Sequence, residues 1–300
     1  MTRSGRRVEL KVPPEAAGNR LDRWLAEALG DDSRARIQRL IETGHVLVDG
    51  MKRPKSFKLM GGEQVEAALV ETERVPAPAA AQPRIAWEDD HLQVVDKPAG
   101  LVVHPAPGHR NITLVELLAE SASGEWEPLV VHRLDKNTSG LMLVAKRPEV
   151  QSRLREAIKR REVLREYLVL LEGRLEAKQG TIDAPLGRDA RRRTRMSTRT
   201  DKPREARTHF EMERFVNGFT LARARLETGR THQIRAHFAA AGHPVCGDPD
   251  YGGAGILGLE RQFLHSARLA LTHPETGAKL EQTSGLPADL AEALERAQAG

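Results

Sequence analysis

A proline- and alanine-rich segment divides this 300-residue chain into two unequal parts. The segment, ETERVPAPAAAQP at 71–83, holds three prolines and four alanines and shows no apolar period. Such a composition favours a semi-extended linker over a helix or a strand. We therefore predict two domains, at 18–75 and 84–300, joined by a linker at 76–83, a division that suits a chain of this length.

The part before the linker carries the signals of two helices and a small sheet. Apolar residues recur at helical spacing in RLDRWLAEALG, 20–30, and again in SRARIQRLIETG, 33–44. The segment HVLVDGMKRP turns at Asp49-Gly50, which is a strong hairpin signal, and GGEQVEAAL adds a short strand. We expect these elements to form one small domain.

Short runs with strand character dominate the part after the linker. They are HLQVVDKP, LVVHP, LMLVAK, VLREYLVLLEG, THFEMERF, FTLARARLET and QFLHSARLAL. Helical spacing is found in ITLVELLAE near 112, EVQSRLREAIKR near 149, RTHQIRAHFAAAG near 230, and PADLAEALERAQ near the C-terminus. Because strands outnumber helices and do not alternate with them regularly, we predict an α+β fold with a mainly antiparallel sheet.

Several classes of chemistry lack their sequence signals. A single cysteine, Cys246, excludes an intramolecular disulfide and a multi-cysteine zinc site. His232 and His237 are five residues apart, and the chain has no HExxH, GxSxG, GxxxxGK[ST] or strand-linked GxGxxG motif. We expect no metal and no cofactor. The N-terminus has no apolar core of signal-peptide length and no window resembles a membrane span, so we expect a soluble cytoplasmic protein without a membrane partner.

The charge of the chain points to a polyanionic partner. The formal net charge is +5 and the isoelectric point is about 9.5. The segment 188–207 holds nine basic and three acidic residues. It is either a solvated loop or a phosphate-binding surface. The candidate RNA-binding residues in it are Arg191, Arg192, Arg193 and Arg195.

One string, HRLDKNTSGLMLVAK at 132–146, carries a candidate nucleophile. Asp135 stands in it before a Thr-Ser-Gly turn and an apolar strand. A structural aspartate that caps a turn is the alternative. The whole string is similar to the signature of the RluA/RluD-type pseudouridine synthases, which isomerise uridine to pseudouridine in structured RNA. VVDKPAGLVVHP at 94–105 and LETGRTHQIRAHFAAAGHPVCGDPDYG at 226–252 resemble two further motifs of that family.

The resemblance implies a set of site residues. Asp135 would attack the sugar or assist its loss of a proton, and Arg230 would pair with it, with Arg235 as the competing arginine. Tyr167 would stack on the uracil. Arg133 would fill the space left by the flipped base, with phosphate neutralisation as the alternative. The supporting residues would be His132 and Thr138 around the loop, and Lys97 and Pro98 as scaffold.

The resemblance also implies the partner. The first domain resembles the S4 RNA-binding module, whose exposed arginines would be Arg34, Arg36 and Arg39. Within the family the chain looks most like the RluD branch, which modifies 23S ribosomal RNA, with the RluC branch or another ribosomal or transfer RNA synthase as the alternative. We expect a monomeric isomerase that acts on ribosomal RNA, either free or in assembling large subunits. A noncatalytic ribosome-assembly protein with the same fold is the rival from another class.

Overall fold

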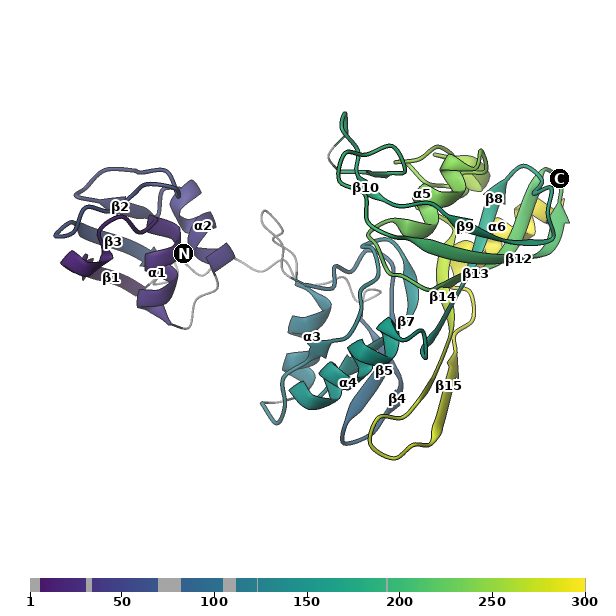
Figure 1. Cartoon of the computed structure of the whole chain (residues 1–300), viewed down its shortest axis with the longest axis horizontal. Coiled ribbons are helices and arrows are strands. Elements are labelled where there is room, and N and C mark those ends of the chain that lie inside the picture. The colour runs from purple at the N-terminus through teal and green to yellow at the C-terminus, as the bar shows by residue number, and fades with distance from the viewer. Residues whose placement is uncertain are drawn as a thin grey trace. The chain divides into compact units, whose positions relative to one another are not determined.

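A computed structural model describes residues 6–30, 34–69, 82–104, 112–122, 124–192 and 194–299. These residues fall into two compact units, one N-terminal and one that holds most of the chain (Figure 1). The linker expected at 76–83 lies mostly outside the described residues, so this boundary stays a prediction. No described helix is long and apolar enough to cross a membrane.

The N-terminal unit joins two helices to a three-stranded antiparallel sheet. The helices are α1 (Leu21–Leu29) and α2 (Arg34–Glu42), and the strands are β1 (Arg6–Lys11), β2 (Val46–Val48) and β3 (Gln64–Leu69). The sheet order is β1-β3-β2. Both predicted helices and the strand predicted in GGEQVEAAL are confirmed. Their apolar stripes meet in one core, to which Leu25, Ile37 and Val65 contribute fully buried side chains.

The hairpin expected at Asp49-Gly50 is only half formed. The chain does turn there, and Val48 and Met51 exchange main-chain hydrogen bonds. The residues after Met51 form no strand, however, and β2 pairs with β3 instead. The third strand is β1, which was not predicted from the sequence. A local turn signal fixes the turn but not the partner strand.

The larger unit is built on a ten-stranded sheet in the order β4-β5-β7-β14-β8-β13-β12-β9, with β15 beside β14 and β6 beside β7. The bounds of these strands are β4 (Arg84–Glu88), β5 (Leu92–Lys97), β6 (Leu129–Val130), β7 (Ser139–Ala145), β8 (Leu164–Glu172), β9 (Gln179–Asp183), β12 (Arg207–Val216), β13 (Phe219–Leu226), β14 (Leu264–Thr272) and β15 (Lys279–Thr283). Strands β7 and β14 run parallel, while the other pairings described are antiparallel. The predicted α+β fold with a mainly antiparallel sheet is confirmed.

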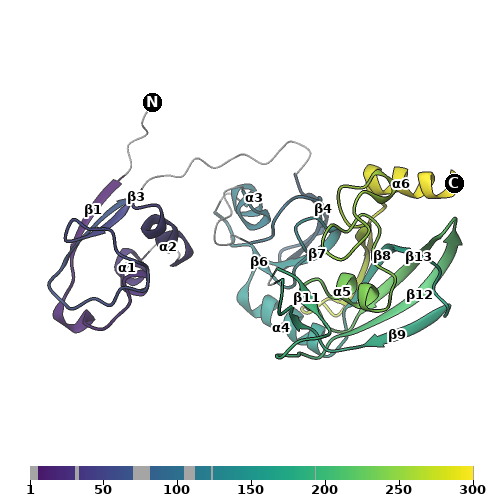
Figure 2. The ribbon, with the colours of Figure 1, turned by 90° about the horizontal axis from the view of Figure 1, so that it is seen from above.

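Four helices and a small ribbon complete this unit, as Figures 1 and 2 show. They are α3 (Leu114–Ser121), α4 (Pro148–Lys159), α5 (Gln233–Ala240) and α6 (Ala288–Ala299), with the ribbon formed by β10 (Gly187–Arg188) and β11 (Met196–Ser197). All four helices were predicted. Val150 and Leu154 of α4 share a core with Leu141 and Leu143 of β7. The run LVVHP forms no strand, and β4, β9 and β15 were not foreseen.

Strand β7 approaches β14 so closely that only glycine fits at position 140. Gly140 has φ +107°, and a Cβ built there would lie 2.2 Å from the main-chain oxygen of Ser266 in β14. All seven residues of β7 are buried. The string that ends in this strand is therefore fixed at the centre of the sheet, and so is the loop that precedes it.

We predict that Gly140→Ala lowers the free energy of unfolding by at least about 2 kcal/mol, because the new Cβ clashes with backbone and the φ angle disfavours a side chain. Gly285→Ala is the matched control, since a Cβ there meets nothing within 4 Å. Urea unfolding of both variants measures the difference. Equal stability of the two variants would contradict the close approach of β7 and β14.

Candidate active site

Asp135 lies in the loop between β6 and β7, four residues before β7 begins. Three side chains from other parts of the unit hold this loop. The bonds run from Lys97 Nζ to Lys136 O (3.0 Å), from Arg261 Nη1 to Asn137 O (3.0 Å), and from Gln262 Nε2 to Thr138 Oγ1 (3.0 Å). The loop also closes on itself, because Thr138 N–H donates to Asp135 O. The Asp135 carboxylate therefore lies on a turn that hydrogen bonds hold in place.

Lys97 is the deepest of these braces. Its side chain is fully buried, and its Nζ also donates to the carbonyl oxygens of Pro98 and Leu101. Burial lowers the pKa of Lys97 to about 7, although the nearby Asp135 raises it. The structure therefore places Lys97 beneath the Asp135 loop, in the scaffold position expected from the sequence.

The arginine beside Asp135 is Arg235 and not Arg230. Arg235 Nη1 lies 3.5 Å from Asp135 Oδ2, whereas Arg230 Nε donates to the main-chain oxygen of Glu205. The expected pairing with Arg230 is corrected accordingly. The difference between the two arginines depends on where the helix begins, because α5 starts at Gln233, three residues after Arg230. Arg230 thus stands outside the helix, and the helix directs Arg235 towards the loop.

Arg235 is held in place by two further carboxylates. Its Nε and Nη2 form a bidentate pair with Asp248 at 2.6 and 2.7 Å, and Nη2 also bonds to Asp250 at 2.7 Å. The Arg235 side chain is only 5% exposed and that of Asp248 is fully buried. A bidentate pair of this kind fixes a guanidinium plane. Burial lowers the pKa of Arg235, but the hydrogen bonds and negative charges of these carboxylates outweigh burial and raise it above its usual value, so Arg235 stays positively charged.

All seven predicted catalytic and substrate-binding residues line a single cavity of about 310 Å³. They are His132, Arg133, Asp135, Thr138, Tyr167, Arg230 and Arg235. The cavity lies on one face of the sheet and has a partly apolar wall that includes Leu134, Ile234 and Leu264. The structure therefore brings the predicted residues together, although it pairs Asp135 with a different arginine.

Tyr167 projects from β8 into this cavity. It lies opposite Ser266 of β14 and Ala224 of β13, and it is 4% exposed. Burial is the main cause that raises the pKa of Tyr167; Asp135 raises it further, and the nearby Arg165 opposes the rise. The hydroxyl therefore stays protonated at neutral pH and can donate a hydrogen bond.

Two aromatic residues that were not predicted complete the site. His232 Nε2 lies 4.0 Å from Asp135 Oδ2, and its Nδ1 is 3.2 Å from the Tyr251 hydroxyl. His232 adopts a left-handed backbone conformation, φ +53°, just before α5. Burial lowers its pKa, so a neutral ring faces the carboxylate despite the attraction of Asp135. Tyr251 stands in the motif GDPDYG, which the sequence indicated as a whole without assigning its members.

The arginines predicted to bind RNA are only partly described. In the ribbon, Asp189 Oδ1 accepts bonds from the main-chain N–H groups of Arg191 and Arg192. The Arg195 guanidinium lies over the Tyr251 ring, 5.7 Å from its centroid. Arg193 and the side chains of the three arginines of α2 lie outside the described residues. Tyr251 links the ribbon to the site, because its hydroxyl bonds to both main-chain groups of Met196.

Known proteins resemble this chain in sequence and in fold. The family model for RNA pseudouridylate synthase matches residues 91–240, and the S4 domain model matches residues 19–65. Ribosomal large subunit pseudouridine synthase D of Nitrosomonas europaea is 44% identical, over 96% of this chain and 87% of that protein. Uncharacterized RNA pseudouridine synthase YlyB of Bacillus subtilis is 39% identical, over 96% of this chain and 97% of that protein.

A solved structure, Human RNA Pseudouridylate Synthase Domain Containing 1, has a TM-score of 0.58 at 26% identity, covering 70% of this chain and 86% of that one. The fold and the cavity thus define an RNA-modifying enzyme with an S4 domain in front of its catalytic unit. The chain belongs to the RNA pseudouridylate synthase family. It is an isomerase that converts uridine to pseudouridine in RNA.

We predict that Arg235→Gln lowers the free energy of unfolding by about 3 to 5 kcal/mol, because it leaves the buried Asp248 without its partner. Arg230→Gln should cost less than about 1 kcal/mol, since Arg230 bonds to main chain at a partly exposed position. Urea unfolding of the two variants compares the arginines directly. Equal losses would contradict the assignment of Arg235 as the arginine that organises the site.

We predict that acid destabilises the enzyme partly through His132. Its Nε2 accepts a bond from Leu143 N–H, and burial lowers its pKa to about 3. The unfolded chain therefore binds this proton near pH 6.5 and the folded chain does not, so stability is lost as pH falls from 6.5 towards 3. Between pH 7 and 5 the wild type should lose about 2 kcal/mol more than His132→Gln. Equal losses of unfolding free energy in the wild type and in His132→Gln, measured by urea unfolding, would contradict this role.

Proposed function

We propose that this enzyme isomerises uridines of large-subunit ribosomal RNA and that Asp135 is its nucleophile. The observation that carries the proposal is the braced carboxylate 3.5 Å from Arg235, in a cavity that also holds Tyr167. The guanidinium places a positive charge beside the carboxylate and orients it in the cavity, and a positioned carboxylate is a group that can act on a sugar.

The proposed reaction needs no redox agent. The N1–C1′ bond breaks and its electron pair leaves with the uracil, which becomes an anion. The Asp135 carboxylate either bonds to C1′ or removes a proton from the sugar. The base then turns and its C5 bonds to C1′; at this step the Asp135–C1′ bond breaks or, on the second path, the sugar takes back its proton. The proton on C5 then leaves, and N1 takes up a proton. Tyr167 is proposed to hold the flipped base by stacking, as aromatic side chains do in enzymes that act on extruded bases.

The remaining residues of the cavity are proposed to bind substrate. Arg133 is exposed and lies two residues before Asp135, where it is suited to enter the stack that the flipped base leaves. His132 and Thr138 support the loop, and Arg230 is proposed to contact the RNA at the cavity wall. The basic ribbon near Arg195 and the S4 domain are proposed to bind the surrounding RNA through phosphates and shape.

The ribosomal target is supported by the relatives. Three proteins called ribosomal large subunit pseudouridine synthase D, from Nitrosomonas europaea, Xanthomonas campestris and Escherichia coli, are 44%, 40% and 39% identical over most of this chain. We propose that the enzyme acts as a monomer in the cytoplasm, on free RNA or on assembling large subunits.

We predict that Asp135→Asn abolishes tritium release from C5-tritiated uridine in 23S ribosomal RNA fragments, with a loss of roughly 1000-fold or more, because the amide cannot act as a nucleophile. Asp90→Asn is the matched control, since Asp90 is exposed in the turn before β5. If the wild type released no tritium from any ribosomal RNA fragment, the ribosomal target would be wrong. If Asp135→Asn matched the wild type, Asp135 would not be the nucleophile.

A further inference from the structure

One buried arginine of the catalytic cavity has no acidic partner in the part of the chain that the structure describes. Arg165 stands on β8 two residues before Tyr167, so both side chains project from the same face of the sheet. Arg165 is 4% exposed and lines the cavity that contains Asp135. Among the described residues no carboxylate forms an ion pair with it, and its buried Nε has no hydrogen-bond partner. A buried guanidinium is therefore left without charge compensation.

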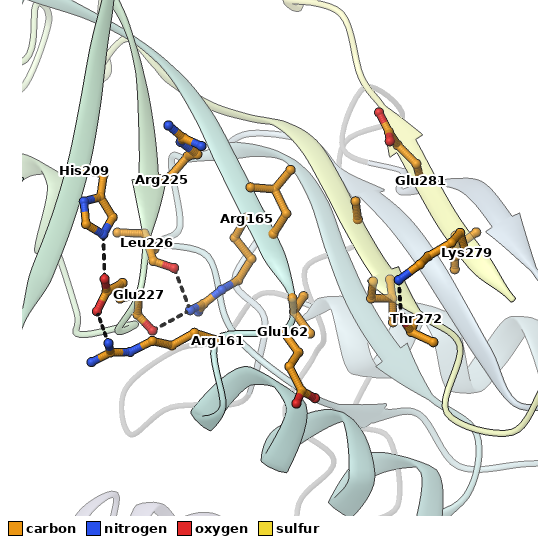
Figure 3. A pocket seen from close by; sticks show the side chains of 15 residues that line it. Arg161, Glu162, Arg165, His209, Arg225, Leu226, Glu227, Thr272, Lys279 and Glu281 are labelled. Atoms are coloured by element: carbon orange, nitrogen blue, oxygen red, sulfur yellow. Dashed lines mark hydrogen bonds and ion pairs between the residues drawn. The ribbon is translucent and has the colours of Figure 1, made fainter. Parts of the chain in front are cut away.

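The guanidinium is nevertheless fixed in position. Its Nη2 donates to the main-chain oxygens of Leu226 and Glu227, at 3.1 and 3.2 Å. Figure 3 shows Arg165 reaching from β8 to these two carbonyls, at the wall of a second hollow of about 700 Å³. Arg165 lines both hollows, so it forms part of the partition between them.

Gly229 shows where the free end of the side chain lies. A Cβ built on Gly229 would come within 2.9 Å of Arg165 Nη1, and the φ angle of Gly229 does not itself call for glycine. Gly229 lines the catalytic cavity beside Arg230 and His232. The glycine thus leaves room for Nη1 at the cavity wall, where its N–H groups have no partner among the described residues.

The charge of Arg165 acts on the catalytic residues. It counteracts the rise in the pKa of Tyr167, and it contributes to the low pKa of His132. Burial of a guanidinium without a counter-ion costs several kcal/mol, and such a cost in a cleft marks a candidate functional group. A guanidinium can only donate hydrogen bonds, so it needs acceptors. An anionic acceptor also balances its positive charge.

We propose that Arg165 binds the carbonyl edge of the target uracil and stabilises the negative charge that the base acquires when it leaves the sugar. This assignment rests on the proposed function. When the N1–C1′ bond breaks, its electron pair stays on the uracil and spreads over N1, O2 and O4. The donors of Arg165 face this charge in a cavity that excludes much of the solvent, where a positioned cation is most effective. The charge disappears when C5 bonds to C1′ and N1 takes up a proton.

The test varies the leaving group. Arg165→Met is compared with wild type in single-turnover reactions on a 23S RNA fragment that the wild type modifies, and on the same fragment with 5-fluorouridine at the target. Fluorine stabilises the departing anion and so makes the base a better leaving group. The rate at which the N1–C1′ bond breaks should therefore depend less on Arg165. We expect a rate loss of roughly 100- to 1000-fold with uridine and a loss at least tenfold smaller with 5-fluorouridine, with the dissociation constant changed less than about threefold.

Arg225→Met is the matched control. Arg225 neighbours Leu226 on β13 but is exposed and paired in register with Glu166, so its side chain leaves the opposite face of the sheet. The Arg225→Met variant should show the single-turnover rate of the wild type on both substrates. Arg165→Lys keeps the charge and should recover part of the uridine rate. Gly229→Ala should displace the guanidinium and show a smaller loss with the same dependence on the leaving group.

The outcomes separate the proposals. An equal rate loss on the two substrates would overturn the role of Arg165 in stabilising the anion. A loss found entirely in the dissociation constant would overturn it too, and would assign Arg165 to an RNA phosphate. If Arg165→Met fails to fold, the same comparison with Arg165→Lys and Gly229→Ala decides between these outcomes. A wild type that is inactive on every ribosomal fragment would instead contradict the proposed function.

Discussion

The ion cluster around Arg235 is the contact on which the site depends. One guanidinium faces Asp135 at 3.5 Å while Asp248 and Asp250 hold its other nitrogens at 2.6 to 2.7 Å. The two short pairs fix the plane of the guanidinium, and the longer contact leaves Asp135 partly uncommitted, with 17% of its side chain exposed. Arg235 can therefore orient the carboxylate without immobilising it completely, which suits a group that is proposed to react with a sugar.

The sheet supplies the rigidity that this contact needs. Because Gly140 allows β7 and β14 to approach closely, the turn that carries Asp135 lies beside β14 and β8, the strands that bear Ser266 and Tyr167. Lys97 braces the turn from below. Arg235 and Arg165, two of the arginines that line the cavity, then differ in purpose. Arg235 is neutralised by carboxylates and positions one of them. Arg165 has no such counter-ion and is proposed to bind the negative charge of the substrate.

The sequence motifs predicted which residues lie together in the cavity, but not which contacts these residues make. The string around Asp135 gave the candidate nucleophile and its strand, but whether Arg230 or Arg235 pairs with it depends on where α5 begins, and helix starts are poorly fixed by local sequence. Asp248 was inside a quoted motif, yet only tertiary packing shows that it contacts Arg235. Arg165 gave no signal, because an arginine in a strand usually reaches solvent.

Asp135, positioned by Arg235, is proposed to convert uridines of large-subunit ribosomal RNA. The most direct measurement maps pseudouridines in 23S ribosomal RNA from a strain that lacks this protein and carries either the wild type or Asp135→Asn on a plasmid. We predict that specific pseudouridines are lost in the deletion strain, return with the wild type and stay absent with Asp135→Asn. An unchanged map in the deletion strain would contradict the ribosomal target, and full restoration by Asp135→Asn would contradict the role of Asp135.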